Sequence, residues 1–457
     1  MNLTNRPFQE IQVGDRAELV RLITSDDLYV FAAASGNYNP MHLIKPQDTS
    51  DGIENSVAPG MFIASLISAV LGTQLPGAGT LYKHQTIDFH DRAHAGDELL
   101  CQVEVIEKKD NGNVVLSTNV FNKLSSQLIL SGIAEVIAPK DKIHFDNVEI
   151  PGLIVQRHRH FELLVSRAQH LQKIATAVVC PHDVNSLGGA FLAAKQGIIT
   201  PIFIGSQQVI SGLVNQLNES LDDYEVIDVQ GDQAAASIAC KLVHEKRVFA
   251  VMKGHLHTDD LLKPMLDKVN GLRIGRRFTH VFVMDVPGLE EPLLVTDAAI
   301  NISPDLATKV DICQNAIDLA LSLDMKPRVG VLSAVETVNP AIQSSIDAAL
   351  LSKMADRGQI HGGFVDGPLA MDNAVDLAAA RTKGIRGDVA GRANILVVPG
   401  LDAGNMLAKQ LAFISHAEGA GLVLGASVPV ILNSRSDSPM SRLASCAVAS
   451  LFYKREP

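Results

Sequence analysis

The chain has 457 residues and a mass of 48.9 kDa, more than one hydrophobic core ordinarily supports, so we expect two or three domains. Hydrophobic residues make up 47% of the chain and charged residues 19%, a balance that excludes a largely disordered protein. The net charge of −11 counts against binding to nucleic acid.

The cysteines and the N-terminus predict a cytoplasmic protein. Five cysteines lie far apart without a CxxC pair, which predicts free thiols and no zinc or other metal site. The N-terminus has no basic segment followed by an apolar core, so we expect no secretory signal. The uncharged residues 57–71 are too few to span a bilayer, so we expect no membrane partner.

A first domain is predicted over residues 1–138. Ser25 caps a short helix over residues 28–34, and a longer apolar helix is expected over residues 59–72. Four strand-like runs follow, joined by short turns that are typical of an antiparallel sheet. These runs cover residues 81–89, 98–107, 114–122 and 127–137. One apolar helix before four strands predicts a sheet curled around that helix.

Residues 139–161 are predicted to be a linker, since they are charged and interrupted by Pro and Gly. The basic run at residues 156–160 favours a solvated boundary over a binding patch. Residues 162–457 then alternate between strand-like and helix-like segments, which predicts a parallel or mixed sheet with helices on both faces. We expect this second domain to form two subdomains with a cleft between them.

The last part of the chain predicts an anion site. Residues 395–398 are expected to form a buried strand, and residues 405–416 a helix that Gly419 and Gly421 end. A further apolar run at residues 428–432 places Ser434 and Arg435 just past its end. Ligands of open α/β sheets gather at the carboxyl ends of strands, and an arginine fork suits phosphate.

Residues 35–43, SGNYNPMHL, place a histidine five residues beyond a short polar side chain. This is either a small site or a capped turn formed by Asn37 and Asn39. Together with residues 57–68 and 75–99, the segment resembles the MaoC-like, (R)-specific enoyl-CoA hydratase family. The resemblance implies the hotdog fold for the first domain, an α+β sheet wrapped around one helix.

The hydratase resemblance implies a catalytic His42 and an oxyanion donor in the backbone N–H of Gly60. The family's motif, SGDxNPxH, has an Asp where this chain has Asn37, and Pro59 replaces the usual His. An amide cannot act as a general base near neutral pH, so we expect hydration to be lost or greatly weakened.

Six segments of the second domain resemble the phosphate acetyl/butyryltransferase family, as in bifunctional enoyl-CoA hydratase/phosphate acetyltransferases. These segments cover residues 251–266, 273–288, 293–320, 329–342, 353–374 and 395–438. The resemblance implies an isopropylmalate-dehydrogenase-like α/β domain that interconverts acyl-CoA plus phosphate with acyl phosphate plus CoA. It implies CoA and inorganic phosphate as substrates, no bound cofactor, and a homodimer or larger homo-oligomer.

The same resemblance implies that Arg435 binds the phosphoryl group and that Ser434 hydrogen-bonds the carbonyl. The family's base Asp lies seven residues after the Ser, where this chain has Ser441, so Asp437 is the nearest replacement. The alternative for Asp437 is a helix cap. Expected substrate-binding residues are Lys253, Ser333, Asp366, Asp372 and Asn405.

Other interpretations stay open at this point. Lys253 is either a ligand or a solvated lysine at a strand end, and Asp372, on a Gly-Pro loop with Asp366, is either a ligand or a helix cap. The first domain is either an active hydratase, with His42 alone or with a carboxylate from elsewhere, or a non-catalytic module that binds acyl-CoA or dimerises. A nicotinamide dehydrogenase is disfavoured because the sequence lacks a suitably placed G-x-G-x-x-G.

Overall fold

The computed structural model describes residues 3–43, 56–145, 159–434 and 437–454. The chain divides into two compact units, Met1–Val155 and Gln156–Pro457. The division falls inside the predicted linker. Residues 144 and 145, at the linker's start, pair with residues 3 and 4 in the first unit, and a helix of the second unit begins at Arg159.

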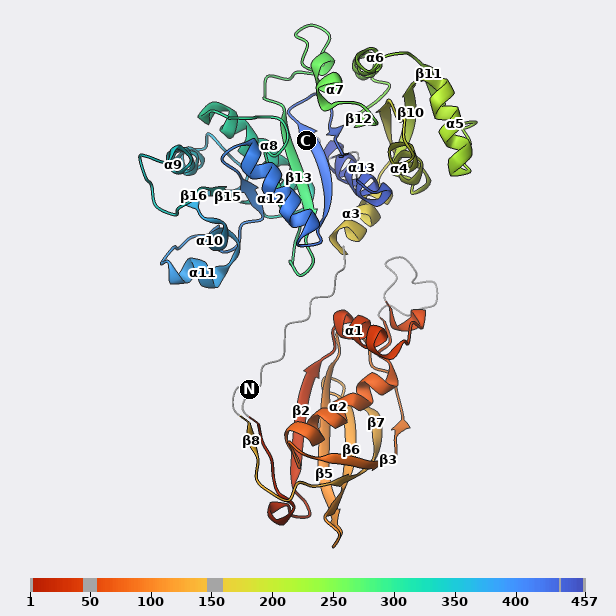
Figure 1. Ribbon diagram of the computed structural model, residues 1–457, viewed down its shortest axis with the longest axis vertical. Helices are drawn as coiled ribbons and strands as arrows, with labels where there is room; N and C mark the ends of the chain where they lie inside the picture. Colours follow the sequence, from red (N-terminus) through yellow and green to blue (C-terminus); the bar gives the residue numbers. More distant parts are fainter. Residues whose placement is uncertain (1–2, 44–55, 146–158, 435–436, 455–457) are drawn as a thin grey trace. The chain divides into compact units, whose positions relative to one another are not determined.

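The first unit is an antiparallel sheet packed on one apolar helix (Figure 1). Its helices are α1 (Ser25–Ser35) and α2 (Gly60–Thr73), with single turns η1 (Phe8–Glu10) and η2 (Pro40–His42). Its strands are β1 (Leu3–Thr4), β2 (Arg16–Leu22), β3 (Leu81–Gln85), β4 (Asp88–Phe89), β5 (Glu98–Lys108), β6 (Asn113–Asn122), β7 (Leu128–Ile137) and β8 (His144–Phe145). The main sheet has the order β2-β5-β6-β7-β3, and β4 also pairs with β7.

Alternation along the strands explains why the sheet curls around α2. Leu99, Cys101 and Val103 of β5 point into the core and are at most 1% exposed, while Gln102 and Glu104 between and beside them lie on the opposite face. Figure 1 shows α2 lying across β5 and β6, and this helix is apolar on most of its surface. The predicted hotdog architecture is confirmed.

The second unit is an eleven-stranded mixed sheet with helices around it. Its helices are α3 (Arg159–Gln169), α4 (Val184–Lys195), α5 (Gln207–Leu217), α6 (Asp232–His244), α7 (Thr258–Met265), α8 (Leu306–Ser322), α9 (Gln343–Asp356), α10 (Met371–Val375), α11 (Leu377–Thr382), α12 (Leu401–Phe413) and α13 (Pro439–Tyr453). Its strands are β9 (Ile174–Val179), β10 (Ile199–Gly205), β11 (Glu225–Asp228), β12 (Ala250–Lys253), β13 (Thr279–Asp285), β14 (Leu293–Thr296), β15 (Arg328–Leu332), β16 (Phe364–Leu369), β17 (Ile395–Val397), β18 (Glu418–Leu424) and β19 (Val430–Ile431).

The sheet has two halves whose strands run in opposite directions. Its order is β11-β10-β9-β12-β19-β18-β13-β14-β17-β15-β16. Strands β11 to β19 in this order are mutually parallel, as are β14 to β16, and the two sets are joined through antiparallel pairs at β18 and β13. Figure 1 shows α4, α5 and α6 around the first half and α9, α10 and α11 around the second. The α/β prediction is confirmed, whereas the cleft between subdomains stays a prediction.

Two local predictions in this unit were wrong. The glycines at residues 419 and 421 do not end a helix, because α12 ends at Phe413 and these glycines lie inside the buried strand β18. A side chain at Gly421 would collide with the carbonyl of Leu432, so tight strand packing explains this glycine.

The second error concerns the Gly-Pro segment after Asp366. It is not a loop, because it lies within β16, and Asp366 is therefore a strand residue. Strand β16 is at the end of the sheet, where a proline costs no hydrogen bond to a neighbouring strand.

Two expectations concern membrane-spanning helices and disulfide bonds. No helix in the described ranges is long and apolar enough to cross a membrane. All five cysteines are buried and free of disulfides, as the spacing predicted.

Lys309 of α8 and Asp347 of α9 form a buried ion pair with an Nζ–Oδ2 distance of 2.7 Å. Replacing Lys309 with Met leaves the carboxylate buried without its cation. We therefore expect the free energy of unfolding of the second unit to fall by about 3–5 kcal/mol. Urea unfolding followed by circular dichroism measures this loss. The double variant Lys309→Met/Asp347→Leu removes both charges and should recover most of it, and a double variant no more stable than the single one would contradict the assignment.

Candidate active site

The turn after β19 presents Ser434 at the surface. The strand itself is buried, Asn433 is 2% exposed, and Ser434 is exposed. The Ser434 N–H donates to Asp437 Oδ2 at 2.9 Å, and Asn433 Nδ2 donates to the same oxygen at 3.1 Å. Asp437 therefore closes the turn that displays Ser434. We call residues 433–438 the serine turn; Arg435 and Ser436 within it lie outside the described residues.

Helix α13 follows the serine turn directly. Its cap is Ser438, whose Oγ accepts from the N–H of Ser441 at 3.1 Å, and Pro439 occupies its first position. The interpretation of Asp437 as the cap of this helix is therefore wrong. Ser441, which stands where the resemblance places a base, is 8% exposed.

Arg442 in the first turn of α13 supports the serine turn from below. Its side chain is 1% exposed, and its Nη2–H donates to the Ser434 carbonyl at 2.9 Å. Burial lowers the pKa of Arg442, while the negative charges of Asp183 and Asp437 act in the opposite direction. Its Nε and Nη1 have no hydrogen-bond acceptor among the described residues.

The ends of the neighbouring strands bring further charged groups to the same edge. Strands β9, β12 and β19 are parallel neighbours, and Asp183, Lys253 and Ser434 come at or just after their carboxyl ends. Lys253 is 4% exposed, so its interpretation as a solvated lysine is wrong. The positions agree with the rule that ligands of α/β sheets bind at this edge.

Asp183 caps α4 and holds a histidine. Its carboxylate accepts from the N–H groups of Asn185 and Ser186, and His255 Nδ1 lies 3.1 Å from its Oδ2. Burial acts to raise the pKa of Asp183, but the hydrogen bonds from Ser186 and the positive charge of Arg442 outweigh it, so the pKa lies below its ordinary value. Asp183 is thus a fixed negative charge beside Arg442.

A buried histidine links the serine turn to the second half of the sheet. His280 of β13 is fully buried, and burial lowers its pKa against the opposing charges of Asp297 and Asp437. Asp297 accepts from the N–H groups of Ala299 and Ile300 in the loop after β14. The amide of Asn405, on α12, donates to the Ala298 carbonyl of the same loop at 3.4 Å. Asn405 of α12 therefore contacts the loop whose Asp297 acts on His280.

The other predicted residues of the second half make local contacts. Ser333 Oγ lies 2.9 Å from Ser344 Oγ, and Asp366 Oδ1 accepts from the N–H of Gly367. Burial raises the pKa of Asp366. Within the described ranges, no hydrogen bond or ion pair joins Ser333 or Asp366 to the serine turn.

Asp372 in α10 is held by a lysine and is not the cap of that helix. The first helical N–H groups follow Ala370, and Asp372 Oδ2 lies 3.1 Å from Lys383 Nζ. The N–H of Asn373 and then the Lys383 ammonium lower the pKa of Asp372. Asp372 is therefore a surface carboxylate that forms an ion pair with Lys383.

In the first unit, the predicted hydratase residues are His42, Asn37 and Gly60, and His42 contacts the segment just before α2. His42 Nδ1 lies 2.7 Å from the Val57 carbonyl, so this nitrogen donates, and within the described residues no hydrogen bond involves Nε2. Asn37 Oδ1 accepts from the Asn39 N–H at 3.3 Å, as expected of a turn former. Gly60 begins α2, and a Cβ there would lie 2.7 Å from the Phe89 ring. The glycine is therefore required by a close aromatic contact.

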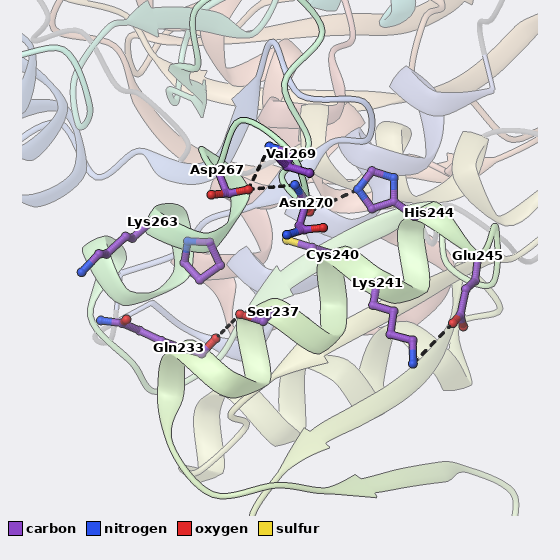
Figure 2. A pocket seen from close by; sticks show the side chains of 11 residues that line it. Gln233, Ser237, Cys240, Lys241, His244, Glu245, Lys263, Asp267, Val269 and Asn270 are labelled. Atoms are coloured by element: carbon purple, nitrogen blue, oxygen red, sulfur yellow. Dashed lines mark hydrogen bonds and ion pairs between the residues drawn. The ribbon is translucent and has the colours of Figure 1, made fainter.

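Figure 2 shows a separate cavity of about 860 Å³ between α6, α7 and the loop after α7. None of the predicted site residues lines it. Several of its polar groups bind one another or the backbone, for example Lys241 with Glu245, and Asp267 with the N–H groups of Val269 and Asn270. We assign this cavity no role.

Sequence reasoning missed Arg442, Asp183, His255 and His280. One signal could have found Arg442, since it is the lone charged residue of α13 and follows the serine turn at once. Asp183 and His255 carry no local signal, because only the parallel pairing of β9 and β12 brings them together. His280 looks like an ordinary strand residue in the sequence.

Comparisons with known proteins place both units. Residues 8–123 match the family model described as MaoC like domain, and residues 230–450 match that of Phosphate acetyl/butaryl transferase. A phosphate acetyltransferase from Rhizobium meliloti is 53% identical over 296 residues, which cover 65% of this chain and 94% of the relative. A phosphate butyryltransferase from Clostridium beijerinckii is 39% identical over 298 residues, 65% of this chain and 99% of the relative.

A solved structure agrees with these relatives. The crystal structure of a branched-chain phosphotransacylase from Enterococcus faecalis has a TM-score of 0.55 and 30% identity, and the match covers 62% of this chain and all of that chain. The chain therefore belongs to the phosphate acetyl/butyryltransferase family and carries a MaoC-like hotdog domain at its N-terminal side.

Proposed function

We propose that the second unit transfers a short acyl group reversibly between coenzyme A and inorganic phosphate. The observation that carries this proposal is the 53% identity to a phosphate acetyltransferase along 94% of that relative's length. The family match at residues 230–450 includes the serine turn. Ser434 has an exposed hydroxyl at a strand end, its carbonyl is bound by the buried Arg442, and the buried Lys253 ends the neighbouring strand. This arrangement supports the binding of an anionic substrate there.

In the forward direction a phosphate oxygen attacks the thioester carbonyl carbon, the C–S bond breaks, and CoA leaves as a thiolate that takes up a proton. Ser434 Oγ is proposed to donate a hydrogen bond to the carbonyl oxygen as negative charge develops on it. Arg435 is proposed to bind the phosphoryl oxygens through its planar fork of donors. Holding the two substrates side by side supplies much of the rate, since well-placed groups reach effective molarities of about 10⁵ M or more.

Asp437 is predicted to be the base that takes the proton from the CoA thiol when CoA is the attacking group, and this role stays a prediction. Asp437 Oδ2 already accepts from the Ser434 N–H and the Asn433 amide, which supports a role in shaping the serine turn. A substrate contact of Lys253 is supported by its place at the end of β12. A substrate contact of Asn405 is supported by its hydrogen bond to the loop that contains Ala298. Contacts of Ser333, Asp366 and Asp372 with substrate rest on the family resemblance alone.

The remaining proposals for the second unit concern its cofactors, its localisation and its oligomeric state. CoA and phosphate are substrates in this scheme, with no bound cofactor, and the reaction is placed in the cytoplasm. Met406 and Phe413 of α12 and the adjacent Ile414 are each more than 60% exposed, which favours a homodimer or larger homo-oligomer. Sedimentation velocity would detect that assembly.

The first unit is proposed to bind acyl-CoA without efficient hydration, because Asn37 replaces the family's Asp. His42 and the helix start at Gly60 support a retained acyl-CoA site. An active (R)-specific hydratase is the second candidate, and the orientation of His42 by the Val57 carbonyl favours it. A binding or dimerising module is the third.

The proposed transfer predicts thiol release from acetyl-CoA or butyryl-CoA only when phosphate is present. Phosphate is the attacking group, so the initial rate should rise with its concentration and saturate. A thiol reagent follows the released CoA. No phosphate-dependent release from any short acyl-CoA would sink the proposal.

Replacing Ser434 with Ala should lower kcat for transfer by roughly 100-fold, because the carbonyl loses a hydrogen-bond donor. Ser427, an exposed serine before β19 whose backbone N–H donates to Leu272, provides the matched control. Ser427→Ala should transfer at the wild-type rate. Equal rates for the two variants would remove Ser434 from the site.

The Asn37→Asp variant should gain hydration of crotonyl-CoA by at least tenfold, since it restores a carboxylate base beside His42. Loss of the enoyl absorbance measures the reaction, and adding His42→Ala should abolish the gain. A wild-type chain that already hydrates crotonyl-CoA rapidly, with activity lost in His42→Ala, would favour the active hydratase.

A further inference from the structure

We propose that Arg442 is a positioning residue for acyl transfer: its buried guanidinium holds the backbone of Ser434 in the conformation that the reaction needs. This inference rests on the proposed function of the second unit. It assigns Arg442 no contact with substrate, and it is separate from the role of Arg435.

The first support is two hydrogen bonds from charged side chains to the backbone of Ser434, whose carbonyl also accepts from the N–H of Asp437 at 3.2 Å. Arg442 Nη2–H donates to the carbonyl of Ser434 at 2.9 Å, and the N–H of Ser434 donates to Asp437 at 2.9 Å. The backbone of the exposed serine is therefore held on both sides by charged groups. Such charge-assisted bonds are stronger than neutral ones, so they fix the direction in which Ser434 Oγ leaves the turn.

The second support is the charge pattern around the guanidinium. Asp437 faces Arg442 from the serine turn, and Asp183 faces it from the start of α4. Asp183 is itself fixed by the first N–H groups of α4. Arg442 thus joins three elements, namely the serine turn, α13 and the segment after β9.

The third support is the cost of this arrangement. Arg442 is 1% exposed, yet its Nε and Nη1 lack acceptors among the described residues. Burying a charge with unsatisfied donors opposes folding, and apolar residues at such positions are often as stable or more stable. A requirement of the reaction explains why a cation stands in a helix that is otherwise uncharged.

Helix α4 makes room for the arginine stem. A Cβ on Gly189 would lie 2.7 Å from Cβ and 2.8 Å from Cδ of Arg442, well inside contact distance. On the adjacent Gly188 the nearest atom would be Leu217 Cδ2 at 3.7 Å, an ordinary contact. The two glycines therefore allow the arginine to be displaced without being removed.

The first experiment compares Arg442→Met and Arg442→Lys with Lys309→Met in the full chain. Arg442→Met should lower kcat by roughly 100-fold, the effect expected when a reacting group moves by about 1 Å. Arg442→Lys keeps the charge, so its kcat should be at least about tenfold higher than that of Arg442→Met. Lys309→Met also removes a buried cation of the second unit but lies away from the serine turn, so it should lose stability and keep kcat per folded molecule.

The second experiment compares Gly189→Ala with Gly188→Ala. Gly189→Ala displaces the arginine stem and should lower kcat by about tenfold with little change in the KM for CoA. Gly188→Ala should match the wild type. This pair remains decisive if Arg442→Met does not fold, because both glycine variants keep every charge.

The outcomes separate this inference from the proposed function. A wild-type chain without phosphate-dependent CoA release overturns both. Wild-type transfer together with wild-type kcat in Gly189→Ala and in folded Arg442→Met overturns only the role of Arg442. A loss in Arg442→Met that matches the loss in Lys309→Met would mean that the arginine is merely structural, and would also overturn it.

Discussion

The serine turn depends on a buried positive charge. Arg442 donates to the carbonyl of Ser434, and Asp437 accepts from the N–H of the same residue. Backbone groups just past a strand end need partners outside the sheet. The two side chains bind one group each, and the N–H of Asp437 also donates to the Ser434 carbonyl at 3.2 Å. Asp183, the cap of α4, balances the guanidinium, so the turn, α13 and α4 share one set of charges.

The reversal of strand direction brings charged groups from both halves of the sheet near the serine turn. Strand β19 runs with the first half of the sheet, and its neighbour β18 runs against it and pairs with β13. His280 on β13 thereby comes within electrostatic reach of Asp437 on one side and Asp297 on the other. The loop of Asp297 in turn contacts α12 at Asn405. Groups from both halves of the sheet are connected through a single buried histidine.

Local patterns predicted much of the fold and part of the site. Strand alternation, turn residues and the apolar stretch at residues 59–72 predicted the hotdog sheet and α2, and the position after an apolar run predicted Ser434 at a strand end. Strand β18 escaped prediction because its glycines resemble a helix stop, and only the nearness of the Leu432 carbonyl and His280 explains Gly421. Asp183 and His255 escaped because only the pairing of β9 with β12, which lie far apart in the sequence, brings them together. Arg442 had a local signal, as the lone charged residue of α13, but its contact with the Ser434 carbonyl follows only from the fold.

The two units combine a MaoC-like domain with a phosphate acetyl/butyryltransferase domain. The central claim is that the second unit joins an acyl group to phosphate. The most direct measurement is phosphorus NMR of the wild-type chain with butyryl-CoA and inorganic phosphate. The account predicts an acyl phosphate resonance that grows in step with free CoA. Release of CoA with free butyrate and no acyl phosphate, at a rate independent of phosphate, would contradict it.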